Sequence, residues 1–240
     1  MDENGRPYIS VILCGWERLD FLTEAIESVF KQTFPLWELV IMDQKEITHR
    51  LAPLLSQHSF RIKIFPGMFD SPAKAQQYGV EHSGGEYLTF LDDDNQKHPD
   101  FFEKMLDFAL KINSPFVVCN SVVINSHRIT ESGVICRTPK PAYITLGLLR
   151  TDNYIDNGEI FVSRKFFNSL GGFDLSLMGF QDWTLSIKAA KALAHRGGIP
   201  VLHESLHSYR IHKDQLTFRV GMAPVWEECR KRIRETYFQA

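Results

Sequence analysis

The amino-acid sequence predicts an α/β fold in which a mainly parallel central sheet is flanked by helices. Apolar segments of strand length alternate with segments of helical periodicity through the first half of the chain, as they do in parallel sheets. One apolar segment, residues 87–91, runs directly into Asp92, Asp93 and Asp94. Since ligands of such sheets bind at the carboxyl ends of the strands, this junction is the first candidate for a functional site.

The first half of the chain supplies four expected strands and two helices between them. One helix begins near Asp20, as its N-cap, and ends before Pro35. The second helix spans about 72–82 and leads into the last of the four strands. The strands are expected at residues 8–13, 38–42, 61–65 and 87–91.

The second half of the chain is less regular. Residues 126–142 are polar and are interpreted as a loop or hairpin. Acidic and basic side chains nearly balance in the last helix, which favours a solvated surface helix over a membrane or partner helix. The other expected elements are a helix from Pro99, strands at 116–120, 122–124 and 157–163, a short helix at 166–170, a helix from about 182 that ends before Gly197, and the last helix at 226–237.

The composition is that of an ordinary globular protein and excludes several classes. A net charge of −2 over 240 residues gives no bulk attraction to nucleic acid or to an anionic membrane. No stretch approaches the ~18 apolar residues of a membrane span, and no signal peptide is visible. Four cysteines without CxxC spacing indicate buried, reduced thiols. We therefore expect a cytoplasmic protein that binds no nucleic acid, with peripheral contact with a membrane and the oligomeric state left open.

Three adjacent carboxylates at the end of a buried strand repel one another and need a counter-charge. A divalent cation with a bound polyphosphate is the commonest way to provide it. The alternative is a solvated acidic turn. The strand in front should hold the cluster at the edge of a sheet, which favours a ligand site.

Six segments then follow one another in a specific order: 8–13, 25–33, 38–43, 85–94, 171–174 and 181–183. Each is weak evidence alone, but their joint order and spacing resembles the family 2 glycosyltransferases of the GT-A fold, over roughly residues 7–217. The resemblance implies a GT-A type, Rossmann-like sheet in one continuous domain, 1–240. It also implies a nucleotide-sugar-binding half at about 7–96, an acceptor-binding half at about 97–217 and a helical tail at 218–240.

The resemblance implies nucleotide-binding roles for Asp43 and Lys74. Asp43 resembles the strand-end carboxylate that accepts a hydrogen bond from the base, and such an acceptor matches the imide N–H of uracil. A turn or helix cap is the alternative for this residue. Lys74 lies where the family often has arginine and could neutralise a diphosphate as a point charge, or it is an exposed helical lysine.

Residues 92–94 resemble the family's DxD element. The resemblance implies that Asp94 binds the metal, while Asp93 and Asp92 contact the ribose or support the metal ligand. Mg²⁺ or Mn²⁺ suits oxygen ligands, with the donor's phosphates completing the shell. His212 belongs to a segment that resembles a late family motif and could approach the metal or the diphosphate, although a lone histidine is more often structural.

Asp182 resembles the family's general base, which accepts the proton of the acceptor hydroxyl as that oxygen attacks the anomeric carbon. The alternative is an N-cap of the following helix. Gln181 stands where the family has glutamate. Together with Trp183, and with Asp156 in the place of an acceptor-side carboxylate, it is assigned to acceptor binding.

These assignments predict a metal-dependent, inverting glycosyltransferase of the hexosyltransferase type. It would move a sugar from a nucleotide diphosphate sugar, with UDP-sugar as the expected donor, to a carbohydrate, lipid-linked or other hydroxyl acceptor. A catalytically silent nucleotide-sugar-binding protein is one alternative. A sugar nucleotidyltransferase is another, but it would need a glycine-rich phosphate loop after the first strand, where Gly15 is the one glycine.

Overall fold

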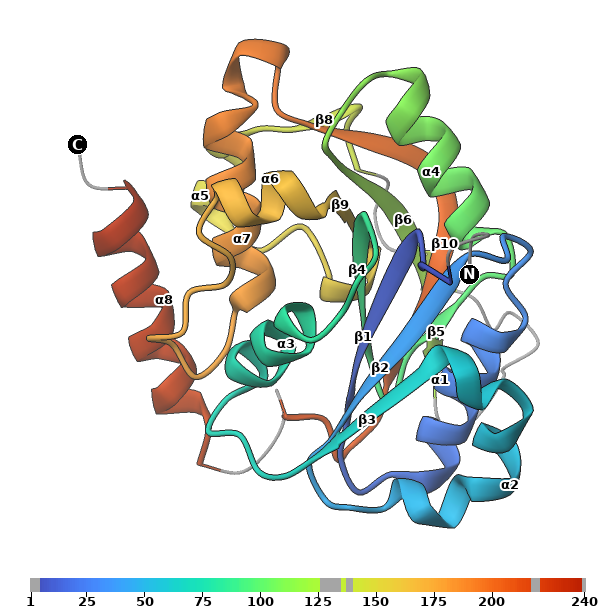
Figure 1. Ribbon diagram of the computed structural model, residues 1–240. Helices are drawn as coiled ribbons and strands as arrows, with labels where there is room; N and C mark the ends of the chain where they lie inside the picture. Colours follow the sequence, from blue (N-terminus) through green and yellow to red (C-terminus); the bar gives the residue numbers. More distant parts are fainter. Residues whose placement is uncertain (1–4, 126–134, 137–139, 217–220, 239–240) are drawn as a thin grey trace.

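A computed structural model describes residues 5–125, 135–136, 140–216 and 221–238 (Figure 1). Its strands are β1 (Ile9–Gly15), β2 (Trp37–Asp43), β3 (Ile62–Pro66), β4 (Tyr87–Asp92), β5 (Gln96–Lys97), β6 (Phe116–Asn125), β7 (Ile135–Cys136), β8 (Tyr143–Ile144), β9 (Ile160–Ser163) and β10 (Ile199–Ile211). Within the described ranges these strands form one sheet, in the order β3-β2-β1-β4-β9-β6-β10-β5, with β7 beside β6 and β8 beside β10. Because β9 pairs with β4, the two halves of the chain share this sheet.

Strand β1 lies at the centre of a parallel group, with β2 and β4 on its two sides and β3 beyond β2. Successive side chains of these strands enter opposite cores: Ile12 and Val40 belong to one apolar cluster, Val11 and Leu39 to the other. A parallel sheet that is buried on both faces reads as continuous apolar runs, which is why these strands are visible in the sequence. The predicted α/β class with a mainly parallel sheet is confirmed.

Helices cover both faces of the sheet. Figure 1 shows α1, α2 and α4 on one side, and α3, α5, α6, α7 and α8 on the other. Their bounds are α1 (Leu19–Phe30), α2 (Ala52–Leu55), α3 (Pro72–Glu81), α4 (Phe101–Lys111), α5 (Leu146–Thr151), α6 (Arg164–Ser169), α7 (Gln181–Ala192) and α8 (Ala223–Phe238), with 3₁₀ turns η1 (Thr48–Leu51), η2 (Ser56–Arg61), η3 (Asn157–Glu159) and η4 (Ala194–Arg196).

Three local predictions are wrong in detail. Helix α1 begins at Leu19 with Arg18 in the N-cap position, so Asp20 lies in the first turn, where its charge suits the helix dipole, and does not cap. The expected strand at 157–163 is a strand only from Ile160, because its first three residues form η3. The two expected strands at 116–124 are one continuous strand, β6.

The sequence does not predict β10, the longest strand. It runs parallel to β6, and its register shifts between Leu202 and Ser205 and again between Ser205 and His207. Such irregularities interrupt the alternation of polar and apolar residues on which strand prediction depends. The strand carries Tyr209 and Arg210 to the edge of the sheet where β4 ends.

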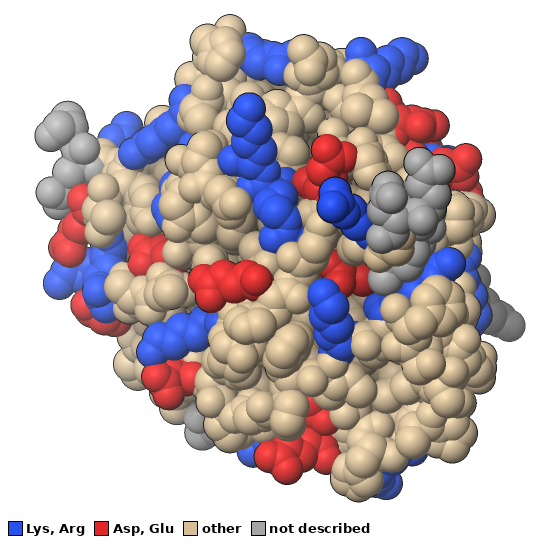
Figure 2. Space-filling model, in the orientation of Figure 1, with Lys and Arg blue, Asp and Glu red and all other residues tan. Residues whose placement is uncertain are grey.

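Helix α8 is not a wholly solvated surface helix. Trp226, Cys229 and Ile233, at helical spacing, are buried, and the last two belong to the apolar cluster under α3 and α7. Within the described ranges no helix is both long enough and apolar enough to cross a bilayer. Figure 2 shows basic and acidic side chains interspersed on one face of the molecule, in keeping with the small net charge.

Two predictions fall partly outside the described residues. The loop or hairpin at 126–142 is described only at 135–136 and 140–142, where β7 pairs antiparallel with β6. Cys14, Cys119 and Cys229 are buried free thiols, as expected, while the Cys136 side chain is not described.

Candidate active site

The carboxyl ends of β1, β2 and β4 open into a cavity of about 480 Å³. Segments of the second half form its other walls, namely the residues before η3, the start of α7, the residues after β10 and the start of α8. A separate hollow of about 420 Å³ beside β3 has no carboxylate among its lining residues. The acidic cavity is therefore the candidate active site, and the aspartates that line it are Asp70, Asp92, Asp93, Asp94, Asp156, Asp182 and Asp214.

A basic side chain, Arg18, contacts the acidic cluster after β4. One guanidinium nitrogen pairs with Asp93, and the other lies 2.9 Å from Asp94 Oδ2 and 3.0 Å from His212 Nε2. Asp93 also accepts a hydrogen bond of 2.9 Å from the Trp16 backbone N–H. Burial raises the pKa of Asp93 to about 6, although Arg18 acts in the opposite direction. The sequence places Arg18 directly after the first strand, and β1 pairs with β4, so adjacency of the two strands is the signal that could have found it.

A divalent cation fits this cluster only if phosphate oxygens of the substrate supply some of its ligands. Among the described residues, no three His, Cys, Asp or Glu side chains come together as a metal cage. Asp94 Oδ2 and His212 Nε2 lie 3.0 Å apart, so these two side chains are the pair that could hold a cation here. Mg²⁺ is commonly held by one or two carboxylates together with substrate phosphates, and this donor set is of that kind.

Another carboxylate of the cavity, Asp182, belongs to the second half of the chain. Asp182 lies in the first turn of α7, where it accepts hydrogen bonds from Asn153 Nδ2 at 2.9 Å and from the Trp183 N–H at 2.8 Å. Burial, and next to it the charge of Asp156, raises the pKa of Asp182 to about 7. A carboxylate with such a pKa is half protonated near neutral pH, as suits a general base. The residue at the N-cap is Phe180, so Asp182 is not the cap of α7.

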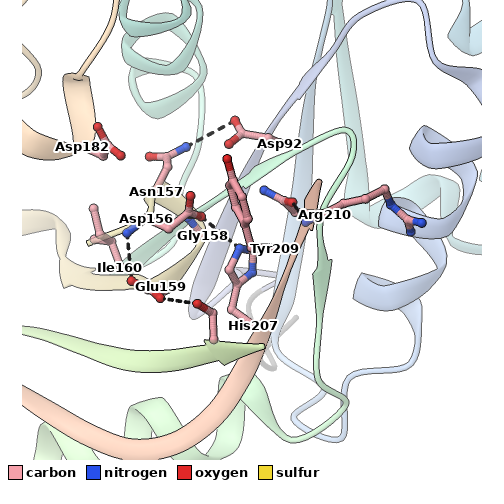
Figure 3. A network of polar contacts seen from close by, with 12 residues as sticks. Asp92, Asp156, Asn157, Gly158, Glu159, Ile160, Asp182, His207, Tyr209 and Arg210 are labelled. Atoms are coloured by element: carbon pink, nitrogen blue, oxygen red, sulfur yellow. Dashed lines mark hydrogen bonds and ion pairs between the residues drawn. The ribbon is translucent and has the colours of Figure 1, made fainter. Parts of the chain in front are cut away.

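Asp156 and Asp92 also line the cavity, and Figure 3 shows them together with Asp182. Asp156 caps η3, with its Oδ1 accepting from the Gly158 N–H at 3.0 Å. Burial raises the pKa of Asp92 well above its ordinary value, and the charges of Asp156, Asp94, Asp93 and Asp182 act in the same direction. The carboxyl groups of the cavity therefore oppose one another's ionisation, and a cationic group of the substrate complex would favour their charged forms.

Other predicted site residues lie in less direct positions. Asp43 is 2% exposed, and its carboxylate accepts hydrogen bonds from the backbone N–H groups of Ile47 and Thr48 at the start of η1. Lys74 Nζ pairs with Asp70 at 2.6 Å on the surface of α3.

On the acceptor side, Gln181 lines the cavity, but Trp183 does not. The Trp183 indole is 1% exposed in the apolar core, where its Nε1 donates a hydrogen bond to the Leu149 carbonyl at 2.8 Å. It supports the turn of α7 that carries Asp182 instead of reaching into the cavity.

Comparisons with known proteins agree on one family. The model of "Glycosyl transferase family 2" matches residues 10–169. An uncharacterized glycosyltransferase of Rickettsia felis is 30% identical over 193 residues, which cover 70% of this chain and 32% of that protein. WfgD of Escherichia coli, named a UDP-Glc:alpha-D-GlcNAc-diphosphoundecaprenol beta-1,3-glucosyltransferase, is 26% identical over 50% of this chain and 48% of its own length. The chain therefore spans a third to a half of these relatives.

Solved structures show the same fold. Residues 1–349 of Staphylococcus aureus TarS in complex with UDP-GlcNAc superpose with a TM-score of 0.68, covering 87% of this chain and 60% of that one at 16% identity. The complex of the same protein with UDP gives a TM-score of 0.66 at 17% identity.

Proposed function

The chain belongs to glycosyl transferase family 2, and we propose that it transfers a sugar from a UDP-sugar to an acceptor hydroxyl with inversion at the anomeric carbon. One observation carries the proposal: Asp182, with a pKa of about 7, lines the same cavity as the acidic cluster after β4. A base and a leaving-group site that line one cavity suit a single displacement, in which the nucleophile attacks from the side opposite the leaving group.

The donor is proposed to bind at the carboxyl ends of β1, β2 and β4. UDP is favoured because TarS was solved with UDP and UDP-GlcNAc and the name of WfgD specifies UDP-Glc. Bound Mg²⁺ or Mn²⁺ would neutralise charge on the diphosphate as it leaves. Asp94 and His212 are the proposed ligands, and Arg18 beside them adds a permanent positive charge.

The acceptor is proposed to enter beside α7. Asp182 takes the proton of the acceptor hydroxyl while the oxygen bonds to the anomeric carbon and the bond from that carbon to the diphosphate breaks. Aromatic side chains on this side of the cavity, Phe180, Tyr209 and Trp226, suit the apolar faces of a sugar ring. A lipid-linked acceptor is one candidate, since the name of WfgD describes such a substrate.

The test is a transfer assay with UDP-Glc and UDP-GlcNAc, Mn²⁺, and saccharide and lipid-linked acceptors. Release of UDP together with a glycosylated product is expected for the protein, and loss of both for Asp182→Asn. Binding of UDP-sugars without product from any acceptor would instead support a silent nucleotide-sugar-binding protein. Formation of pyrophosphate from a sugar phosphate and UTP would support a nucleotidyltransferase.

A further inference from the structure

Asp156 rests on a buried histidine to which the proposed reaction gives no role (Figure 3). His207 of β10 is 1% exposed, and its Nε2 lies 3.0 Å from Asp156 Oδ1. Neither ring nitrogen makes an aligned hydrogen bond to a described residue. Burying an imidazole without such bonds costs free energy. A histidine kept at this position in spite of that cost suggests a role for its contact with Asp156.

The chain makes room for this ring at Gly158. A Cβ atom at that position would lie 2.1 Å from His207 Cε1 and 2.4 Å from Nε2. Only glycine therefore lets the imidazole pack against the backbone of η3, directly under the residue that η3 follows, Asp156.

Buried hydrogen bonds also fix the turn η3, which follows Asp156. The Asp156 N–H donates to Glu159 Oε2 at 2.8 Å, and Glu159 Oε1 accepts from Lys140 Nζ at 2.7 Å and from Ser121 Oγ at 2.6 Å. Lys97 Nζ donates to the Gly158 carbonyl. Because both sides of the turn are tied to buried cations, the Asp156 carboxylate has a defined place on the cavity wall.

Several titratable groups lie near Asp156. They are His207 of β10, Lys97 of β5, Glu159 of η3, Asp92 of β4 and Asp182 of α7. The charge of Asp156 is the second cause, after burial, of the raised pKa of Asp182. The charge of Asp156 therefore adds to the effect of burial on how readily Asp182 takes a proton.

We propose that His207 is a positioning residue: through its contact with Asp156 it holds that carboxyl group at the wall of the cavity that Asp182 also lines. The inference rests on the proposed role of Asp182 as general base. His207 acts only through Asp156 and reaches no reacting atom.

The test is a carbon-13 NMR titration of the Asp182 carboxyl group in aspartate-labelled protein, assigned by loss of the signal in Asp182→Asn. Asp156→Asn should lower the pKa of Asp182 by about 1 unit, because a neighbouring negative charge is removed while burial remains. His207→Phe keeps a ring against Gly158 but no nitrogen, and should shift the titration in the same direction by less. In the double variant His207→Phe should add nothing to Asp156→Asn.

Controls separate this effect from general disturbance. His203 lies exposed on the same strand, so His203→Phe should leave the titration unchanged. If His207→Phe does not fold, His207→Leu removes the same nitrogens with a smaller side chain.

An Asp182 titration that is the same in wild type and in the His207 variants would overturn the role of His207. An unchanged titration in Asp156→Asn would overturn the coupling itself. Because the titration needs no substrate, it stands even if no donor is ever transferred, and failure of the proposed function remains distinguishable from failure of this inference.

Discussion

Asp182→Asn is expected to stabilise the folded protein at neutral pH while it removes the base. Burial and the charge of Asp156 raise the pKa of Asp182 from 3.8 to about 7. A rise of that size corresponds to about 4 kcal/mol of unfavourable free energy for the ionised form in the folded state. Since the side chain is partly exposed in the cavity, solvent screening reduces the expected gain to about 2 kcal/mol.

The sign follows from the direction of the change in pKa. An acid whose pKa is higher in the folded state binds its proton more tightly there, so its ionisation destabilises the fold as pH rises. The destabilisation is absent below the ordinary value of 3.8, grows between 3.8 and about 7, and is complete above that pH. The advantage of the asparagine variant should therefore be smaller at pH 5 than at pH 8.

Urea unfolding followed by circular dichroism at pH 5 and pH 8 measures this difference. Asp174→Asn is the matched control of opposite sign. Although burial acts to raise the pKa of Asp174, hydrogen bonds from Ser176 lower it, so its replacement should destabilise the protein at pH 8. If Asp182→Asn is no more stable than wild type at pH 8, the ionised Asp182 does not destabilise the folded protein, and the reasoning is refuted.

Three further predictions concern the turn, the acidic cluster and the donor. Gly158→Ala should lower the free energy of unfolding in urea by about 1–3 kcal/mol, because its Cβ would collide with the His207 ring. Gly147→Ala is the control and should leave the free energy of unfolding unchanged, since the nearest atom to its Cβ would be 3.6 Å away. Equal effects of the two substitutions would reject the packing argument. Arg18→Gln should tighten Mn²⁺ binding in the absence of nucleotide by about tenfold in calorimetry, because a cation that pairs with Asp94 is removed, and unchanged or weaker binding would contradict this. UDP at ~100 times its Kd should stabilise the protein by about 2.7 kcal/mol with Mn²⁺ in a thermal unfolding assay, and the same stabilisation in EDTA would count against a metal.

The parallel part of the sheet could be predicted because burial on both faces leaves an unmistakable apolar run in each strand. Strand β10 could not, because its register shifts mix polar and apolar positions. Asp20 has the residue type of an N-cap, but α1 already begins at Leu19, and the residue in the N-cap position is Arg18, which pairs with Asp93. A residue type favoured at caps does not by itself fix where a helix starts.

Some residues of the candidate site could be predicted from the sequence, and others could not. Asp92, Asp93, Asp94, Asp156 and Asp182 could be selected from the sequence, since carboxylates at the ends of strands and helices stand out by type and position, and the structure brings them to one cavity. The side chains that contact these carboxylates could not be selected from the sequence.

Arg18 and His207 reach the acidic residues from 75 and 51 positions away in the chain, and nothing local marks them. Trp183 illustrates the converse: its place next to Asp182 suggests the cavity, but the helical turn directs its ring into the core.

The most direct test of the central claim is an NMR measurement of the product formed from an α-linked UDP-sugar by wild type and by Asp182→Asn. The account predicts a β-linked product from wild type, and a rate about 10²- to 10⁴-fold lower from the variant with UDP affinity retained. An α-linked product, or near-normal turnover by the folded variant, would contradict a single displacement with Asp182 as its base.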